Sequence, residues 1–562
     1  MSSPLRLNLL VSFPFFSLIV VFGLLSNGVY HDDDLTHYLM ARWAGWYPSY
    51  LLHIWGRPGL TLPLAAVAWI GDREIGWHAA RLLSAIVTTA SALLAAHVAR
   101  RFEIRPAWLV VVFLFLQPLA TLLGFTTLTE NFAALYLIAA VALLQGGRPL
   151  FASAVFSLVL VTRHETAAFL PVWCMALFRS GAGVPARRDR ITALVLSLWA
   201  PVAHNIAYYA VFDSWPLRIF FQARGSTQYT PQALWSYLPD ALYAVPPAIA
   251  GLAIVGTAVM LRRRAWLVPA IAATFFLTQV AIKALGVYGS GGYGRFLVVI
   301  APFIAILAVA GVAELIARLR ERRPIDLLTL ILAIVWLVGL IAFELERIER
   351  RQEWREDTLW LMRGTVVAIL FLLLAWAVFG RRGGNRYASP IIAGLLMATC
   401  LIQCAAILRP LRLRPSQELA RQAVHWLGER GLADSPIFAT DPWFAYFLDL
   451  VENPRAHKGA MLLASMPVGT VFIWDSIYSP SDFHRLPAEE FDRDSHYELL
   501  RILSLTEKSR YELRLYRKTS PTPLPTTREV YYPPVPEDPE PVRGSYYIRP
   551  YPHKKPGAPS PR

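Results

Sequence analysis

Charged side chains are scarce in this chain of 562 residues. They make up 17% of the sequence, where a soluble protein carries about 25%, and 55% of the residues are hydrophobic. The mean hydropathy is +0.42. This shortage of charge excludes an ordinary soluble enzyme and predicts a polytopic membrane protein with room for one further domain.

Cysteine is nearly absent, since only Cys174, Cys400 and Cys404 occur, all in apolar runs. No spacing among them suits a disulfide or a metal site, so we interpret them as packing residues. Acidic residues are outnumbered, and the net charge of +15 comes mostly from Arg. Much of this charge lies in short clusters between apolar runs, so it reports membrane topology rather than nucleic-acid binding.

No small-residue cleavage site follows the first apolar run, which we therefore interpret as a retained helix. A spanning helix needs about 20 apolar residues, and about thirteen stretches approach that length. The sequence thus predicts an all-α polytopic transmembrane domain over residues 1–409. The predicted spans are 7–27, 77–99, 107–125, 128–145, 150–162, 166–178, 191–212, 241–261, 265–285, 296–316, 325–343, 359–379 and 389–408.

The Arg clusters fall on alternate loops. With the N-terminus inside, every cluster lies on the inner side, as the positive-inside rule requires. The segment 28–76 is then the first external loop. It carries several Trp residues, and we expect short helices along the membrane surface that break at Pro48 and at Arg57-Pro58-Gly59.

The chain changes character after residue 409. Residues 410–518 are predicted to form a small extracytoplasmic α/β domain, with an amphipathic helix opening at Ser416 and buried strands at 436–440, 471–474 and 511–516. From residue 519 to 562 the chain is Pro-rich, so we expect disorder or extended structure there.

Three consecutive carboxylates, Asp32, Asp33 and Asp34, follow the first predicted span. Carboxylates are costly near hydrocarbon and usually face water, a partner or a reaction. One interpretation is a solvated cap on a helix that begins near Leu35, since Asp suits a helix N-terminus. The other is an acidic catalytic centre on the first external loop of a membrane enzyme.

Three further polar features are predicted on the same external side. Glu130 lies in a short turn between apolar runs, Arg163 and Glu165 lie between two short runs, and Tyr293 and Arg295 follow a Gly-rich segment. Each has a structural alternative, such as a cap, an ion pair or a turn. Their predicted placement on one side favours a functional site.

These residue types suit sugar transfer from a lipid-anchored phosphate. An Asp can take the proton of an acceptor hydroxyl, and a guanidinium can hold the departing phosphate with paired donors. Carboxylates also stabilise the oxocarbenium-like state of sugar transfer.

The order of these motifs carries a family resemblance. The run Asp33-Asp34-Leu35-Thr36-His37-Tyr38-Leu39-Met40-Ala41 resembles the Asp-Glu motif on the first external loop of GT-C glycosyltransferases. These include protein O-mannosyltransferases and lipid A aminoarabinose transferases. Three later stretches resemble the family's continuation, its Thr-Arg-x-Glu step and its Arg-Tyr segment: Arg57-Pro58-Gly59-Leu60, Leu160-Val161-Thr162-Arg163-His164-Glu165 and Arg295-Phe296-Leu297. The resemblance covers roughly residues 10–320.

The resemblance implies roles for single residues. Asp33 aligns with the family's catalytic base, Asp34 replaces the usual Glu and His37 a usual Tyr, and these departures leave the choice among the three Asp residues open. It also implies a polyprenyl-phosphate sugar donor, a glycan, lipid or protein acceptor, and in some members a divalent metal such as Mg²⁺ or Mn²⁺. The residues expected to bind substrate are Glu130, Arg163, Glu165, Arg295, Tyr293, His37 and Arg57.

The leading hypothesis is an inverting, hexosyl- or mannosyl-type glycosyltransferase, with its active site on the extracytoplasmic face of a bacterial inner membrane. The first alternative is a transporter or flippase of lipid-linked saccharides, which would need charged groups near mid-membrane and paired broken helices. The second is a polysaccharide polymerase or ligase, which would use the same kind of donor.

Overall fold

The computed structural model describes most of the chain. The described residues are 3–179, 187–213, 215–216, 230–286, 292–321, 331, 397–398, 400–405, 407–452, 463–480, 486–505, 511–522 and 547–548. They form two compact units. The helical unit comprises Met1–Leu25, Ala80–His204 and Ala223–Pro410, and the composite unit comprises Ser26–Ala79, Asn205–Gln222 and Leu411–Arg562.

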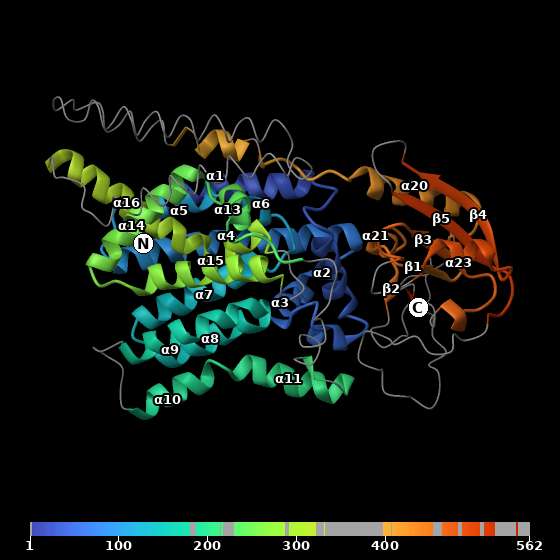
Figure 1. The fold of residues 1–562 in the computed structure, drawn as a ribbon, viewed down its shortest axis with the longest axis horizontal. Helices are drawn as coiled ribbons and strands as arrows, with labels where there is room; N and C mark the ends of the chain where they lie inside the picture. The colour runs from blue at the N-terminus through green and yellow to red at the C-terminus, as the bar shows by residue number, and fades with distance from the viewer. Residues whose placement is uncertain are drawn as a thin grey trace, which may run out of the picture. The chain divides into compact units, whose positions relative to one another are not determined.

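The helical unit is built from α-helices with short 3₁₀ segments between them (Figure 1). Helices α4 and α11 begin in one unit and end in the other. The elements are α1 (Ser3–Leu25), α4 (Arg73–Arg101), α5 (Trp108–Phe115), α6 (Pro118–Leu123), α7 (Glu130–Gln145), α8 (Pro149–Thr162), η2 (His164–Phe169), α9 (Leu170–Arg179), α10 (Arg187–Leu196), α11 (Trp199–Phe212), η3 (Leu234–Tyr237), α13 (Leu238–Ala244), α14 (Pro247–Arg262), α15 (Leu267–Leu285), η4 (Gly294–Ile300) and α16 (Ala301–Glu321).

Helices α14 and α16 approach each other closely at two glycines. A Cβ added to Gly256 would lie 1.7 Å from the carbonyl oxygen of Leu307, and one added to Gly311 would lie 2.1 Å from that of Leu252. Small residues let two apolar helices touch backbone to backbone, which is the usual packing of membrane helices. This contact fixes α14 against α16, whose N-terminal half and preceding η4 are buried.

Proline divides two of the predicted spans. The span predicted at 107–125 is divided into α5 and α6, which begins at Pro118. The span predicted at 241–261 is divided by a 107° bend between Leu234–Ala244 and Pro247–Arg262. Proline lacks an N–H and clashes with the preceding helical turn, so each of these two breaks falls at a proline.

The described residues contain four helices long and apolar enough to cross a membrane, or up to six if each bent pair is one span. The predicted number of about thirteen is therefore not confirmed. The predicted spans 325–343 and 359–379 and much of 389–408 lie outside the described residues. Long apolar helices nevertheless make this an integral membrane protein.

The composite unit joins segment 28–76, which is predicted to be the first external loop, to the C-terminal α/β domain. Its N-terminal elements break at Pro48 and at Arg57-Pro58, as the sequence predicts. The elements are α2 (Asp32–Trp43), η1 (Pro48–Leu52), α3 (Pro58–Ala68), α20 (Pro415–Glu429), β1 (Ile437–Ala439), α21 (Pro442–Phe447), β2 (Val451–Glu452), β3 (Val471–Asp475), α23 (Ala488–Arg493), β4 (Tyr497–Ser504), β5 (Glu512–Lys518) and β6 (Tyr547–Ile548).

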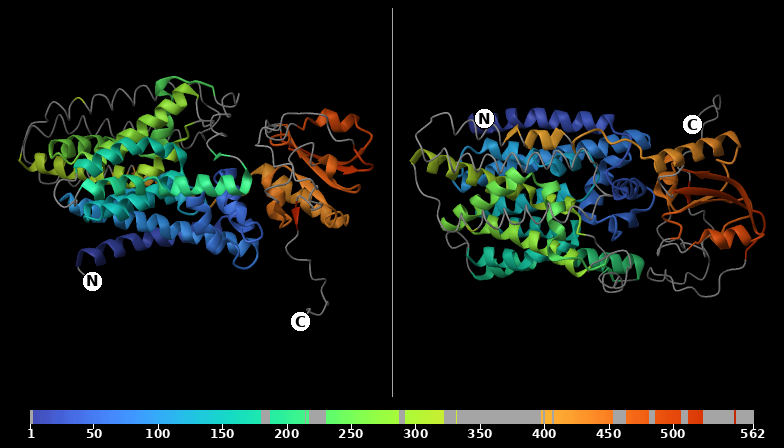
Figure 2. Two further views of the ribbon diagram at one scale, coloured as in Figure 1. Left: turned by 90° about the horizontal axis from the view of Figure 1, so that it is seen from below. Right: turned by 45° about the horizontal axis from the view of Figure 1, so that its top comes forward.

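The main sheet has the strand order β1-β3-β5-β4 and packs against α20 (Figure 2). Strands β1 and β3 are parallel, with Phe438 opposite Phe472, and β5 runs antiparallel to both β3 and β4. The predicted strands at 436–440, 471–474 and 511–516 are thus confirmed. Strand β4 was not predicted, because Tyr497–Ser504 shows no regular alternation of buried and exposed residues.

The structure adds detail at the two ends of the C-terminal region. Helix α20 begins at Pro415 rather than Ser416, and the backbone N–H of Arg414 donates to Gln417 Oε1 at 2.9 Å as its cap. In the tail expected to be disordered or extended, Tyr547–Ile548 form the short strand β6, which pairs with β2. The rest of the tail beyond residue 522 lies outside the described residues.

Residues far apart in sequence meet within the composite unit. The backbone N–H groups of Asn27 and Gly28 both donate to the carbonyl of Leu411 at 3.0 Å. The indole N–H of Trp43 donates to the carbonyl of Leu450 at 2.9 Å, and the guanidinium of Arg73 donates to that of Phe447 at 2.7 Å. These bonds tie the first external loop to the C-terminal domain across about 400 residues of chain.

Candidate active site

The three carboxylates form the first turn of α2. The helix begins at Asp32, and Nδ1 of the N-cap residue His31 accepts from the backbone N–H of Asp33 at 3.3 Å. The expectation of a helix that begins near Leu35 is therefore wrong by one turn. Acidic side chains are favourable at this end of a helix dipole, so a run of three Asp residues starts the helix rather than preceding it.

The three carboxylates differ in their surroundings. Asp32 accepts from the Tyr478 hydroxyl at 2.6 Å and from the Gln417 amide at 3.3 Å. Asp33 lies 3.2 Å from His31 Nδ1, and its side chain is 20% exposed. Asp34 is fully buried. Asp33 is thus more accessible than Asp34, and Asp32 is held by the C-terminal domain.

Two predicted substrate residues also lie in the composite unit. His37 follows Asp33 by one helical turn, on the same face of α2, and it is buried. Arg57 is the N-cap residue of α3 and has φ +63°, which is unusual for a residue with a Cβ. Such strain is common at functional positions, so Arg57 stays a candidate.

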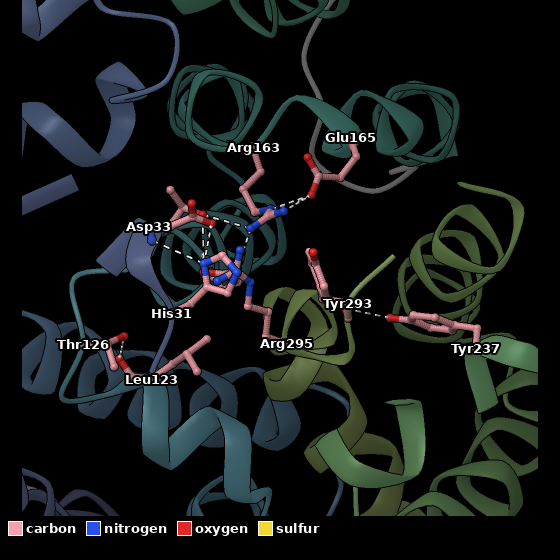
Figure 3. A network of polar contacts seen from close by, with 11 residues as sticks. His31, Asp33, Leu123, Thr126, Arg163, Glu165, Tyr237, Tyr293 and Arg295 are labelled. Carbon is pink, nitrogen blue, oxygen red and sulfur yellow. Dashed lines mark hydrogen bonds and ion pairs between the residues drawn. The ribbon is translucent and has the colours of Figure 1, made fainter. Parts of the chain in front are cut away.

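The helical unit holds a buried charge network centred on Arg163 (Figure 3). Arg163 Nη1 donates to Glu130 Oε1 at 2.7 Å and to Thr129 Oγ1 at 3.0 Å. Its Nε donates to Glu165 Oε1 at 2.6 Å. The ion pair between Arg163 and Glu165 that the sequence offered as a structural alternative is therefore formed. The side chains of Arg163, Glu130 and Glu165 are each 5% exposed or less.

Arg295 joins the same network through Glu130. Its Nε lies 3.4 Å from Glu130 Oε1, and its side chain is 6% exposed. The guanidinium carbon lies 5.3 Å from the ring centre of Tyr293 and 5.4 Å from that of Phe296, and that of Arg163 lies 3.9 Å from the Phe296 ring. Two Arg and two Glu side chains therefore balance in charge beside aromatic rings.

The glycines before Arg295 serve packing where the structure describes them. Gly292 has φ +59°, and a Cβ there would lie 2.9 Å from the Cβ of Lys283. A Cβ on Gly294 would lie 2.3 Å from the carbonyl oxygen of Asp240. Residues 287–291 of this segment lie outside the described part of the chain.

The sequence did not single out four polar residues in these two units. Lys283 forms an ion pair with Asp240 in the helical unit. Asp441 is buried in the composite unit two residues after β1, and Asp475 is buried at the end of β3. The available signal was a carboxylate following each of two buried strands. Parallel strands bring such residues to one edge of a sheet.

The family resemblance implies one possible cofactor, a divalent metal ion that some members need. Among the residues that the structure describes, no group of three or more His, Cys, Asp or Glu side chains is arranged to hold one. The divalent metal therefore stays a prediction from the resemblance.

Comparison with known proteins identifies the fold. Neither a protein-family model nor a curated protein matches the sequence. Two solved structures of ArnT from Cupriavidus metallidurans do match, and each comparison covers 90% of this chain and 97% of that one. The structure bound to undecaprenyl phosphate is 12% identical with a TM-score of 0.53, and the apo structure is 13% identical with a TM-score of 0.54.

A weaker likeness links the chain to the Archaeoglobus fulgidus oligosaccharyltransferase tethered with an acceptor peptide. It has a TM-score of 0.37 and 12% identity, and it covers 74% of this chain and 57% of that one. The chain thus has a fold of the GT-C type, and the resemblance predicted from its motifs is confirmed at the level of the fold.

Proposed function

We propose that this protein is a membrane glycosyltransferase that moves a sugar from a polyprenyl-phosphate carrier to an acceptor hydroxyl. The observation that carries the proposal is the fold likeness over 97% of the ArnT chain, in a structure that holds undecaprenyl phosphate. The accessible carboxylate at the start of α2 and the buried Arg–Glu network of the helical unit support it.

In the proposed reaction Asp33 is the general base. It takes the proton of the acceptor hydroxyl as the acceptor oxygen bonds to the anomeric carbon. The bond from that carbon to the phosphate oxygen breaks, and the polyprenyl phosphate leaves with the electron pair. Attack opposite to the leaving group inverts the anomeric centre. Asp33 suits this role because it is 20% exposed, whereas Asp34 is buried and Asp32 accepts from Tyr478.

Arg295 is proposed to bind the phosphate of the donor. The two Arg residues of the network differ, because Arg163 donates to Glu130, Thr129 and Glu165 at 2.6–3.0 Å. The ion pair from Arg295 to Glu130 is longer, at 3.4 Å. A guanidinium presents paired donors in a fixed plane, which match the oxygens of a phosphate.

Arg163, Glu130 and Glu165 are proposed to position Arg295 rather than to touch the reacting atoms. Glu130 lies between the two guanidiniums and pairs with both. Removing one member of a buried ion network leaves an uncompensated charge, so these residues act as a unit. His37, Arg57 and Tyr293 remain proposed substrate-binding residues.

A transporter or flippase remains the second candidate, because the described residues include two bent helix pairs, at 44° and 107°. Broken helices are a feature of transporters. The two functions differ in chemistry, because a flippase moves the intact lipid-linked saccharide and a transferase cleaves it.

The test is a transfer assay on purified protein with a panel of polyprenyl-phosphate sugars and acceptors bearing free hydroxyl groups. We expect release of polyprenyl phosphate together with a glycosylated acceptor of inverted anomeric configuration. Translocation of intact donor in proteoliposomes without any cleavage would replace the proposal by the flippase.

A further inference from the structure

Two parallel strands of the α/β domain, β1 and β3, end at the same edge of the sheet. Thr440 and Asp441 follow β1, and Asp475 is the last residue of β3. Because β1 and β3 are parallel neighbours, their carboxyl ends lie at the same edge of the sheet. Thr440, Asp475 and Ser479 are hydrogen-bonded to one another there, and Asp475 and Ser479 are fully buried.

Asp475 shapes the turn that follows β3. Its Oδ1 accepts from the backbone N–H groups of Ile477 at 2.9 Å and Tyr478 at 2.6 Å. Its Oδ2 accepts from the hydroxyls of Thr440 and Ser479. A buried carboxylate with four donors fixes the backbone of this turn, and the turn determines where Tyr478 points.

From the turn that Asp475 fixes, Tyr478 contacts Asp32 in the first turn of α2. Its hydroxyl donates to Asp32 Oδ2 at 2.6 Å, a short bond to a charged acceptor. From α20, the amide of Gln417 donates to Asp32 Oδ1 at 3.3 Å, and the guanidinium of Arg414 donates to the carbonyl of Tyr30 at 2.6 Å. The C-terminal domain therefore holds the chain on the N-terminal side of Asp33.

We propose that Tyr478 is a positioning residue for the transfer reaction and holds Asp32 so that the adjacent Asp33 keeps its catalytic orientation. This inference rests on the proposed function. Three adjacent carboxylates repel one another, and the bond from Tyr478 stabilises one of them in place. The α/β domain thus has a role in the reaction itself, because it holds the first turn of α2 in place. This role is independent of any binding of the acceptor.

The decisive variant is Tyr478→Phe, which removes one hydroxyl and keeps the ring. The matched control is Tyr516→Phe, because the buried Tyr516 also donates to a carboxylate, Asp492, at 2.7 Å in the same domain. This bond joins β5 to α23 and does not involve α2. Both variants remove a tyrosine hydroxyl bound to an Asp, so they share the general cost to folding.

We expect Tyr478→Phe to lower kcat by about 10- to 100-fold, as a small misplacement of a reacting group does, and to leave KM for the donor nearly unchanged. Tyr516→Phe should change neither. Asp32→Asn keeps an oxygen that accepts from Tyr478 and should be mild, whereas Asp32→Ala should resemble Tyr478→Phe. The double variant Tyr478→Phe/Asp32→Ala should be no slower than either single one, because one bond is lost in each case.

Hydrogen exchange provides a reading that does not need activity. The amides of residues 32–36 should exchange faster in Tyr478→Phe than in wild type and in Tyr516→Phe. Unchanged exchange there, or kcat equal to that of the control, would overturn the inference even in an active enzyme. A wild-type protein without transfer activity would instead overturn the proposed function, with the exchange data still reporting the contact.

Discussion

At the scale of single residues, three identical side chains in one helical turn have three different environments. Asp32 is bonded to Tyr478 and Gln417, Asp33 is partly exposed beside His31, and Asp34 is buried. A carboxylate can act as the base only when it reaches the proton of the acceptor hydroxyl. The negative charge of the departing phosphate must be stabilised by another group. The three side chains are chemically identical, so only their different surroundings favour Asp33 as the base.

Asp33→Asn keeps the shape of the side chain and removes its basicity. We expect turnover to fall by about 10²–10⁴-fold, the usual contribution of a positioned base. Donor affinity should change little, since the phosphate is proposed to bind Arg295. The measurement is single-turnover transfer with a thermal melt for each variant, and Asp32→Asn is the control. Near-normal turnover in folded Asp33→Asn would remove this assignment.

Arg295→Ala should weaken binding of a polyprenyl-phosphate donor by about tenfold or more, because a charge-assisted bond to a charged group contributes about 1.5–3 kcal/mol. Arg295→Lys should recover only part of the affinity, because an ammonium lacks the paired donors. Arg318→Ala is the control, since Arg318 bonds locally to Glu314 at 2.6 Å on α16. Equal donor affinity in Arg295→Ala and Arg318→Ala would exclude Arg295 from the site.

Asp441 predicts a pH dependence of the α/β domain. Burial raises the pKa of Asp441 to about 8. The charge of Asp475 is the second cause, and that of Asp32 is a minor one. Hydrogen bonds from Tyr511 and from the backbone of Trp443 oppose the shift. Burial raises the pKa of Asp475 as well. An unfolded Asp titrates near pH 4, so its contribution to stability is complete below that pH and is lost as pH rises through about 8.

The melting temperature of the wild-type domain should therefore fall by at least about 4 °C between pH 5 and pH 8, which corresponds to about 1 kcal/mol for a domain of this size. Asp441→Asn, which mimics the protonated acid, should flatten this dependence. Glu489→Gln, an exposed change on α23, should leave it intact. A wild-type profile that rises over the same pH range would contradict the sign of the shift.

At the scale of elements, helix contacts in the helical unit depend on where glycine is placed. The α14–α16 contact places each glycine against a carbonyl of the other helix, at distances that a Cβ cannot occupy. The same residue type has no such role in α20, where a Cβ on Gly428 would have no neighbour within 4 Å among the described residues. A glycine in a helix therefore has structural meaning only through its neighbours.

Gly256→Ala and Gly311→Ala should each destabilise the protein by about 1–3 kcal/mol, because the two helices must move apart. Gly428→Ala should be neutral or slightly stabilising, since it only adds helix propensity. Thermal melts in detergent report the difference. If all three variants melt alike, the close packing of α14 on α16 is incorrect.

At the scale of the whole molecule, the orientation in the membrane remains a prediction from the Arg clusters. Gln422 on α20 and Gly146 after α7 are both exposed, so a cysteine at either position can be labelled. A cysteine at position 422 should react with an impermeant reagent from outside, and one at position 146 should not. The reverse pattern would invert the topology and place the proposed transfer on the cytoplasmic face.

The sequence by itself determined the features that arise from local pattern. Apolar runs marked the four long apolar helices among the described residues, the breaks at Pro48 and Pro58 marked the helices of segment 28–76, and buried runs marked β1, β3 and β5. The order of the motifs, beginning with Asp33-Asp34, indicated the GT-C fold. All of these depend on residues close together in the chain, where periodicity and the missing N–H of proline act directly.

Only the tertiary structure decided the features that depend on contacts over long distances in the chain. It showed that Tyr478 holds Asp32, that Glu130 lies between Arg163 and Arg295, and that the first external loop packs with the C-terminal domain. Tyr478 and Asp32 are 446 residues apart. No local pattern encodes which of many distant partners a side chain meets, because that choice is made by packing of the whole fold.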